Sequence, residues 1–180
     1  MYLCSGFCLF AIMVHIAPHA TDLGISTATA ANILAAIGAA SIVGKVVLGS
    51  AADRIGGRQV FIICFTLMSA SLLWLVPSSE VWMLYLFAVV FGLAYGGMGA
   101  VGSPLAAGLF GVRSLGLIFG VLSTGLMGGC ALGPIVAGYL FDITGSYQMA
   151  FMISAAISII GLILAVVLRL VSLKKSELAS

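Results

Sequence analysis

The chain has 180 residues, of which 63% are hydrophobic and 7% are charged, and its formal net charge is +2. A soluble domain carries roughly 25% charged residues, so this composition predicts an integral membrane protein. The net charge is too small, and the basic residues too scattered, for a nucleic-acid partner. The four cysteines lie inside apolar stretches. A thiol there behaves as a small hydrophobe, so we predict no disulfide, metal site or cofactor.

Six stretches of the chain are long and apolar enough to cross a membrane as helices, which takes about 20 residues each. They are approximately residues 3–20, 28–51, 60–77, 82–106, 115–140 and 148–171. Short segments rich in turn-forming residues separate them. The fourth stretch stays apolar past Pro104 to Phe110, so a kink at Gly102–Pro104 is an alternative to a stop. We therefore predict an all-α membrane protein in which residues 1–180 form a single six-helix transmembrane domain.

The basic residues favour one side of the membrane. With six spans, both termini and the loops after the second and fourth spans share a side. That side carries all but one of the basic residues: Arg54, Arg58, Arg113, Arg169, Lys174 and Lys175. The opposite loops contain Asp22, Glu80 and Asp142 and neither Lys nor Arg. The positive-inside rule then predicts cytoplasmic termini for a multi-pass protein, which we expect in the plasma (inner) membrane.

The spacing of one polar turn recurs later in the chain. Gly49, Asp53 and Gly56 follow the pattern G-x3-D-x2-G, and Gly138, Asp142 and Gly145 repeat it 89 residues further on. An internal repeat of this kind indicates two related units in tandem.

The fifth apolar stretch has glycines four residues apart, which lie on one face of a helix. They are Gly116 and Gly120, then Gly125, Gly129 and Gly133. Without side chains on that face, a neighbouring backbone can approach closely, which is how helices associate in lipid. We therefore expect the fifth helix to be buried in protein, whether the contact is static or a sliding interface.

Lys45 is the basic residue inside a predicted span and the first candidate for substrate binding. It precedes Asp53 by eight residues, or about 12 Å along a helix, and so lies near the middle of the membrane. A charge at that depth is costly and by default marks a substrate or ion pathway. The alternative is a lysine that extends to the headgroups or is neutralised by a carboxylate.

His15 and Tyr95 are weaker candidates for the same site. His15 and His19 lie four residues apart near the end of the first span that faces away from the predicted cytoplasmic side. Histidine titrates near neutral pH, so His15, the deeper of the two, could serve a proton-linked role; a satisfied structural histidine is the alternative. Pro18 disrupts the geometry that a metal site would need. Tyr95 could line a cavity in the fourth span or simply pack there.

The turn after the second span is a candidate gate. It contains Gly49, Asp53, Arg54, Gly56 and Arg58. A charge network that holds adjacent helices in one state and releases them in another is one interpretation, and a plain solvated turn is the other.

This turn resembles the loop motif of the major facilitator superfamily, G-x3-D-R-x-G-R-R in outline, with Gln59 replacing the last basic residue. Gly133–Gly138 and Asp142–Tyr147 look like the end of helix eleven in that superfamily. His15–Gly24 is similar to helix seven of its monocarboxylate and oxalate/formate branch. The resemblance covers the whole chain as the C-terminal half, in which six helices form two inverted three-helix repeats.

The resemblance implies a secondary transporter, not an enzyme, that moves a small organic anion such as a monocarboxylate by alternating access, as a symporter or antiporter. In that branch a basic residue at the position of Lys45, usually arginine, binds the substrate carboxylate. Substrate binds between two six-helix halves, so the resemblance also implies a missing N-terminal half, in the same polypeptide or in another chain. A non-transporting or dimer-dependent scaffold or sensor, or a carrier half for a non-carboxylate solute, remain alternatives.

Overall fold

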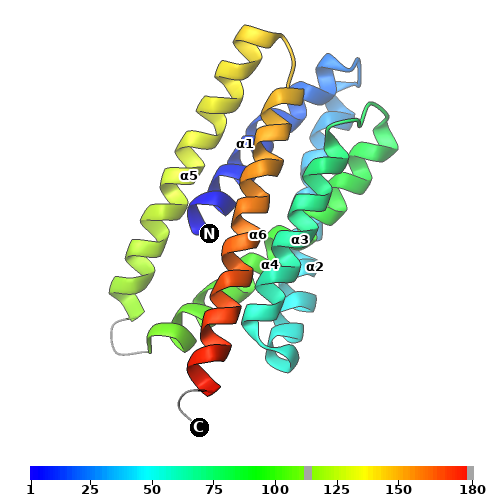
Figure 1. The fold of residues 1–180 in the computed structure, drawn as a ribbon. Helices are drawn as coiled ribbons and strands as arrows, with labels where there is room; N and C mark the ends of the chain where they lie inside the picture. The colour runs from blue at the N-terminus through cyan, green and yellow to red at the C-terminus, as the bar shows by residue number, and fades with distance from the viewer. Residues whose placement is uncertain (112–114, 178–180) are drawn as a thin grey trace.

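The computed structural model describes residues 1–111 and 115–177 and contains six helices in these ranges (Figure 1). The helices are α1 Tyr2–Asp22, α2 Thr27–Ile55, α3 Gly57–Leu75, α4 Val81–Phe110, α5 Leu115–Thr144 and α6 Gln148–Glu177. All six are long and apolar enough to cross a membrane. No strand occurs in the described ranges.

The helices are longer than several of the apolar stretches that predict them. α4 continues as one helix through Pro104 to Phe110, so it does not stop after the glycines that precede the proline. α5 likewise continues through Pro134 to Thr144. A proline removes one backbone donor from a helix, and in lipid that loss is tolerated where neighbouring groups satisfy the freed carbonyl.

The two members of the internal repeat end their helices in the same way. Gly56 has a φ of 90° and Gly145 a φ of 66°, in the left-handed region that favours glycine. Gly56 follows the last residue of α2, and Gly145 follows the last residue of α5. The sequence repeat therefore corresponds to a repeat of local structure.

The helix contacts show that α1–α3 and α4–α6 are two related units. The most extensive contacts are between α1 and α5 and between α2 and α4. In the repeat, α1 corresponds to α4, α2 to α5 and α3 to α6. This correspondence turns the α1–α5 contact into the α2–α4 contact, and it leaves the α3–α6 contact unchanged. α3 and α6 therefore meet at the axis that relates the units.

A hydrogen bond marks this axis at the level of single residues. Ser69 of α3 and Ser158 of α6 are buried, and their hydroxyl oxygens are 2.8 Å apart. The two serines are 89 residues apart, which is the spacing of the sequence repeat. A residue that bonds its own repeat counterpart lies on the axis, so this pair locates it inside the core.

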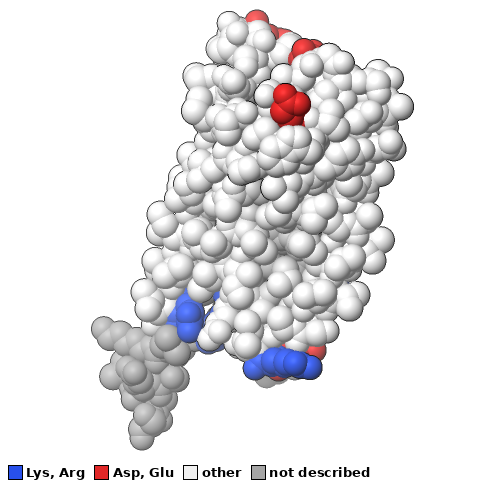
Figure 2. All heavy atoms as spheres, turned by 90° about the vertical axis from the view of Figure 1, so that its right-hand side faces the viewer, with Lys and Arg blue, Asp and Glu red and all other residues white. Residues whose placement is uncertain are grey.

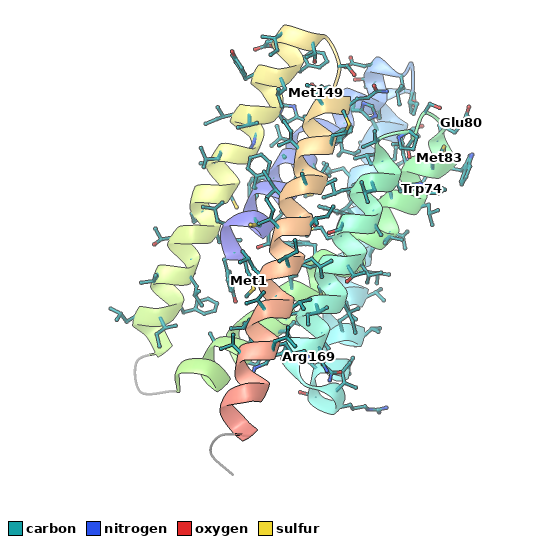
Figure 3. The ribbon with its side chains drawn as sticks, in the orientation of Figure 1. Met1, Trp74, Glu80, Met83, Met149 and Arg169 are labelled. Carbon is teal, nitrogen blue, oxygen red and sulfur yellow. The ribbon has the colours of Figure 1, made fainter. Side chains whose placement is uncertain are left out.

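Charge separates the two ends of the molecule. In Figure 2 most red carboxylate atoms lie at one end and the blue basic atoms at the other, with a long uncharged stretch between them. We name these the acidic end (Asp22, Glu80, Asp142) and the basic end (Arg54, Arg58, Arg169). Figure 3 shows Glu80 and Arg169 at these opposite ends. The side chains of Arg113, Lys174 and Lys175 lie outside the described residues.

Two exposed tryptophans lie at the acidic end. The Trp74 and Trp82 ring centroids are 6.1 Å apart, and the Trp74 indole N–H donates to the Met83 carbonyl at 3.3 Å. Figure 3 shows Trp74 and Met83 close to Glu80. Tryptophans of this kind typically lie at the membrane–water interface.

Candidate functional site

Glycines bring α2 and α4 into backbone contact around the position of Lys45. A Cβ on Gly44 would clash with the carbonyl of Leu93, and one on Gly96 would clash with the carbonyl of Ser41. Small residues at such crossings let membrane helices approach closely. The glycines therefore permit a tight α2–α4 crossing, and Lys45 follows directly after one of its contact points.

Lys45 lies at the edge of this crossing. A Cβ on Gly99 of α4 would be 3.7 Å from Cε of Lys45, so the lysine stem passes over a glycine of the facing helix. Lys45 is exposed in this chain, four residues from Ser41 at the middle of α2. Lys45 therefore lies roughly 6 Å from the middle of α2, toward the basic end.

The described carboxylates are remote from Lys45. Asp53 lies on the same helix about 12 Å further toward the basic end. The others lie at the acidic end, beyond the middle of the membrane-spanning region.

Tyr95 belongs to the same helix pair as Lys45. It is half-buried, packs against the core, and precedes Gly99 by one helical turn. Its position agrees with the packing interpretation as well as with a cavity wall.

The structure places His15 in a different helix pair from Lys45. The His15 Nε2 atom is 3.1 Å from the Pro134 carbonyl oxygen of α5. Its ring centroid is 5.2 Å from that of Tyr147, just before α6. His15 therefore lies between α1 and α5, whereas Lys45 lies between α2 and α4.

The two candidate positions are nevertheless related by the repeat. Lys45 and Pro134 are 89 residues apart, the repeat spacing, and each lies where its helix crosses a helix of the other unit. The inverted repeat thus puts a polar side chain at each of two equivalent crossings, Lys45 on one and His15 on the other.

Aromatic rings surround the two histidines at the acidic end. His19 is buried, with its ring edge-on to Phe151 at 4.9 Å, and Phe141 stacks on Tyr147 at 4.3 Å. Burial, with smaller effects from the charges of Asp22 and Asp142, raises the pKa of the Tyr147 phenol. Tyr147 therefore stays protonated near neutral pH and is part of a packed cluster.

The glycines of α5 are covered only over part of the helix. Cβ atoms on Gly129 and Gly133 would clash with backbone atoms of Leu3 and Phe7 in α1. At Gly116, Gly120 and Gly125 a Cβ would meet no atom within 4 Å. Within this chain, the expectation that the whole fifth helix is buried is therefore wrong: α1 covers only the second half of the glycine face.

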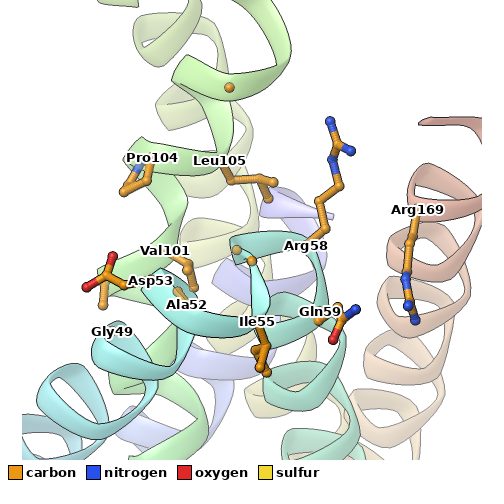
Figure 4. Close-up of a pocket in the computed structure, with 14 residues that line it drawn as sticks. Gly49, Ala52, Asp53, Ile55, Arg58, Gln59, Val101, Pro104, Leu105 and Arg169 are labelled. Atoms are coloured by element: carbon orange, nitrogen blue, oxygen red, sulfur yellow. The ribbon is translucent and has the colours of Figure 1, made fainter. Parts of the chain in front are cut away.

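The polar turn between α2 and α3 forms part of a cavity of about 560 Å³ at the basic end (Figure 4). Four of the candidate gate residues line it: Gly49, Asp53, Gly56 and Arg58. The lining does not include Arg54, but it includes Arg169 of α6. Figure 4 shows the Asp53 carboxylate beside Pro104 and the Arg58 side chain on the side of Arg169.

Sequence reasoning identified Arg169 as a charge that orients the chain but missed its place in this cavity. The sequence feature that points to this place is the position of Arg169 at the end of the last apolar stretch, on the same side of the membrane as the turn between α2 and α3. Nothing in the sequence states that α6 lies beside α3. Among the described residues, no cluster of His, Cys, Asp and Glu could hold a metal ion.

Comparisons with known proteins agree with the fold. The family model of the Major Facilitator Superfamily matches residues 1–180. Human monocarboxylate transporter 2 is 29% identical over 152 residues, which cover 82% of this chain and 32% of the relative. Tetracycline resistance protein, class E, of Escherichia coli is 32% identical over 111 residues, covering 62% and 27%.

A solved structure gives the same result for the fold. A crystal structure of the peptide transporter POT, a mutant in complex with sulfate, superposes with a TM-score of 0.83 at 19% identity, covering 93% of this chain and 36% of that one. The chain spans about a third of the length of the curated relatives that it matches.

Proposed function

Because the chain belongs to the Major Facilitator Superfamily, we propose that its six helices form one half of a secondary transporter for a small organic anion, with a monocarboxylate as the first substrate class. The observation that carries this proposal is Lys45, a cation near the middle of a membrane-spanning helix, remote from the described carboxylates. A cation at that depth of the membrane is costly, and an anionic substrate would compensate its charge.

The relatives support the same substrate class. Several of them, at 29% and 31% identity, are named monocarboxylate transporters. In the proposed site the Lys45 ammonium binds the substrate carboxylate as a point charge, because lysine lacks the planar fork of arginine. Tyr95 and His15 would line the path on α4 and α1.

The second half of the transporter would cover the exposed faces of this chain. α2 and α5 are the helices with the least buried surface, and Lys45 is on the exposed part of α2. Substrate would then bind between the halves, near the middle of the membrane. We propose that residues 1–180 form a single domain with the basic end in the cytoplasm of the plasma (inner) membrane, and that the Asp53–Arg58 turn gates that side.

A non-carboxylate solute is the second candidate substrate class. The favouring observation is the similarity to a protein named for tetracycline resistance. This alternative keeps the transporter mechanism and assigns Lys45 another role, such as binding a different anionic group.

Substitution of Lys45 tests the proposal in the full-length transporter. We expect Lys45→Gln to reduce uptake of radiolabelled L-lactate at least about tenfold, because one lost charge-assisted interaction of about 1.4 kcal/mol corresponds to that factor. Lys45→Arg should retain much of the uptake. The matched control is Val43→Gln, another exposed α2 position, with every variant compared at equal amounts in the membrane.

Two outcomes decide between the substrate classes. Undiminished lactate uptake by Lys45→Gln would contradict the binding role of Lys45. Absence of lactate uptake in the wild type, with uptake of another solute, would favour the non-carboxylate alternative.

A further inference from the structure

We infer that His19 is a pH-sensitive switch at the acidic end. While its ring is neutral, it holds α1 against the start of α6 and against the turn between α3 and α4. When the ring is protonated, these contacts are released and the acidic end loosens. This regulation goes beyond the proposed transport function, and Lys45 takes no part in it.

The His19 ring lies where three elements of the fold meet. Only 8% of its surface is exposed, and its ring is edge-on to Phe151 at 4.9 Å and to Tyr147 at 5.9 Å between centroids. Figure 3 shows Met149, in the same first turn of α6, at this end of the molecule. The backbone of Ser78, buried in the turn between α3 and α4, is the hydrogen-bonding group beside the ring. One side chain of α1 therefore joins both repeat units at the acidic end.

The surroundings of the ring fit its neutral form. The Nε2 atom of His19 is buried and has no hydrogen-bond partner among the described residues. A neutral imidazole has one N–H and one nitrogen without a proton, whereas the imidazolium ring has two N–H groups that both need acceptors. Protonation would place a charge and an unpaired N–H inside an aromatic cluster, which is costly because neither has a partner there.

The charged groups near the ring lie at the surface and not inside the cluster. Asp22, one turn after His19 on α1, is the carboxylate whose charge acts on the ring, and it is exposed. Asp142 of α5 and Glu80 before α4 are exposed too. The remaining titratable neighbours are the Tyr147 phenol and His15, which contacts the same tyrosine. An exposed carboxylate attracts a protonated ring toward water, so protonation draws the ring out of the cluster.

The response falls in the range below neutral pH. Histidine ordinarily titrates near pH 6.5. Packing that needs a neutral ring is at full strength above this pH, and its equilibrium constant falls by up to about tenfold for each pH unit below it. Between pH 7.5 and pH 5.5 the opening of the acidic end should therefore increase by up to about tenfold.

Hydrogen exchange of the full-length transporter in nanodiscs, measured by mass spectrometry, tests the switch without measuring transport. Two backbone N–H groups report on the elements that His19 joins: that of Ser78 donates to the Leu75 carbonyl, and that of Phe151 to the Tyr147 carbonyl. Exchange rates are measured at pH 7.5 and pH 5.5, and each is divided by the rate of an unstructured peptide at the same pH.

We expect the corrected exchange rates of segments with these two N–H groups to rise roughly five- to tenfold at pH 5.5. The segment with Gly56, whose N–H donates to the Ala52 carbonyl at the basic end, should not change. His19→Phe keeps an aromatic ring without a titratable nitrogen, so it should remove the rise. His15→Gln is the matched control, because His15 is the other histidine of α1 and also contacts Tyr147; it should keep the rise.

Three results would overturn the inference: corrected rates at the acidic end that stay constant or fall at pH 5.5, a rise that persists in His19→Phe, or a rise that disappears in His15→Gln. If the His19→Phe protein does not fold, His19→Gln replaces it with the same expectation. A transporter that exchanges as expected but takes up no lactate would contradict the proposed substrate and not the switch.

Discussion

At the scale of single residues, Gly56 determines how the chain reverses between α2 and α3. It is the one residue between the two helices, and its φ is 90°. Its N–H donates to the Ala52 carbonyl, and its own carbonyl accepts from the N–H groups of Gln59 and Val60. The residue thus ends one helix and begins the next, which leaves no room for a longer loop.

Replacing Gly56 by alanine is expected to destabilise the protein by roughly 1–3 kcal/mol, since its φ of 90° with a ψ of 139° is a backbone conformation that is essentially limited to glycine. The measurement is the free energy of unfolding in detergent micelles with increasing denaturant. Gly38→Ala is the control, because Gly38 is helical and a Cβ there meets no atom within 4 Å. It should be neutral or stabilising by about 0.5–1 kcal/mol. Equal effects of the two substitutions would contradict this role of Gly56.

Lys45 and His15 are the two candidate site residues whose positions are defined by contact with another helix. Lys45 crosses Gly99, and His15 contacts the carbonyl of Pro134. The lysine is costly in the membrane under any interpretation. Substitution of Lys45 is therefore the most direct test of function. His15, in contrast, already has a structural partner in the Pro134 carbonyl.

At the scale of elements, the packing of whole helices follows from small residues. Gly92, Gly96 and Gly44 allow α2 and α4 to meet at backbone distance, and Gly6, Gly129 and Gly133 do the same for α1 and α5. At most of these positions the would-be Cβ clashes with a backbone carbonyl, which no rotamer change can relieve. At both crossings the helix backbones are in direct contact, and these contacts join the two three-helix units.

The Ser69–Ser158 pair is the polar link between α3 and α6. A double-mutant cycle with Ser69→Ala and Ser158→Ala should give a coupling free energy of about 0.6 kcal/mol and at most about 1.7 kcal/mol, the range for hydrogen bonds between membrane helices. The measurement is denaturant unfolding of the two single variants and the double variant.

Ser71→Ala provides the control cycle with Ser158→Ala. Ser71 is also buried on α3, but its hydroxyl donates to the Met68 carbonyl of its own helix at 2.8 Å. It should show no coupling to Ser158. Coupling of equal size in both cycles would mean that the bond between the two repeat units has no specific contribution.

At the scale of the whole molecule, the charge asymmetry between the ends is the main determinant of orientation. The helix ends bring the basic turn, the end of α4 and the end of α6 to one side, and the acidic loops to the other. Basic residues are retained on the cytoplasmic side during insertion, so the basic end should face the cytoplasm.

Cysteine labelling tests this orientation. In the full-length transporter with its native cysteines replaced by alanine, the exposed acidic-end position is changed by Ser79→Cys and the exposed basic-end position by Arg54→Cys. A membrane-impermeant maleimide added to intact cells should label the Ser79→Cys variant directly and the Arg54→Cys variant only after permeabilisation. The reverse pattern would show that the basic end faces outward.

The exposed apolar surface is the second property of the whole molecule. Large hydrophobic side chains of α2 and α5 are exposed in this chain: Ile42, Val43, Val46, Val47, Leu117, Val121, Met127, Leu132, Ile135 and Tyr139. Surface of this kind is stable in lipid or against another helical half, and it agrees with the share of the relatives' length that the chain spans.

Sequence alone determined the membrane character, the number and approximate extents of the apolar helices, the repeat and the tight turn at Gly56. These features depend on local patterns: runs of apolar residues, the spacing of Gly and Asp, and the loops in which the basic residues occur. They need no knowledge of which helix lies beside which.

Only the tertiary structure decided the partners of the candidate residues. It placed His15 against Pro134 and not beside Lys45, brought Arg169 to the cavity of Arg58, and left half of the α5 glycine face uncovered. These arrangements depend on how helices far apart in the sequence cross. The crossings result from close backbone contact between small residues, and a glycine does not specify by itself which helix it will meet.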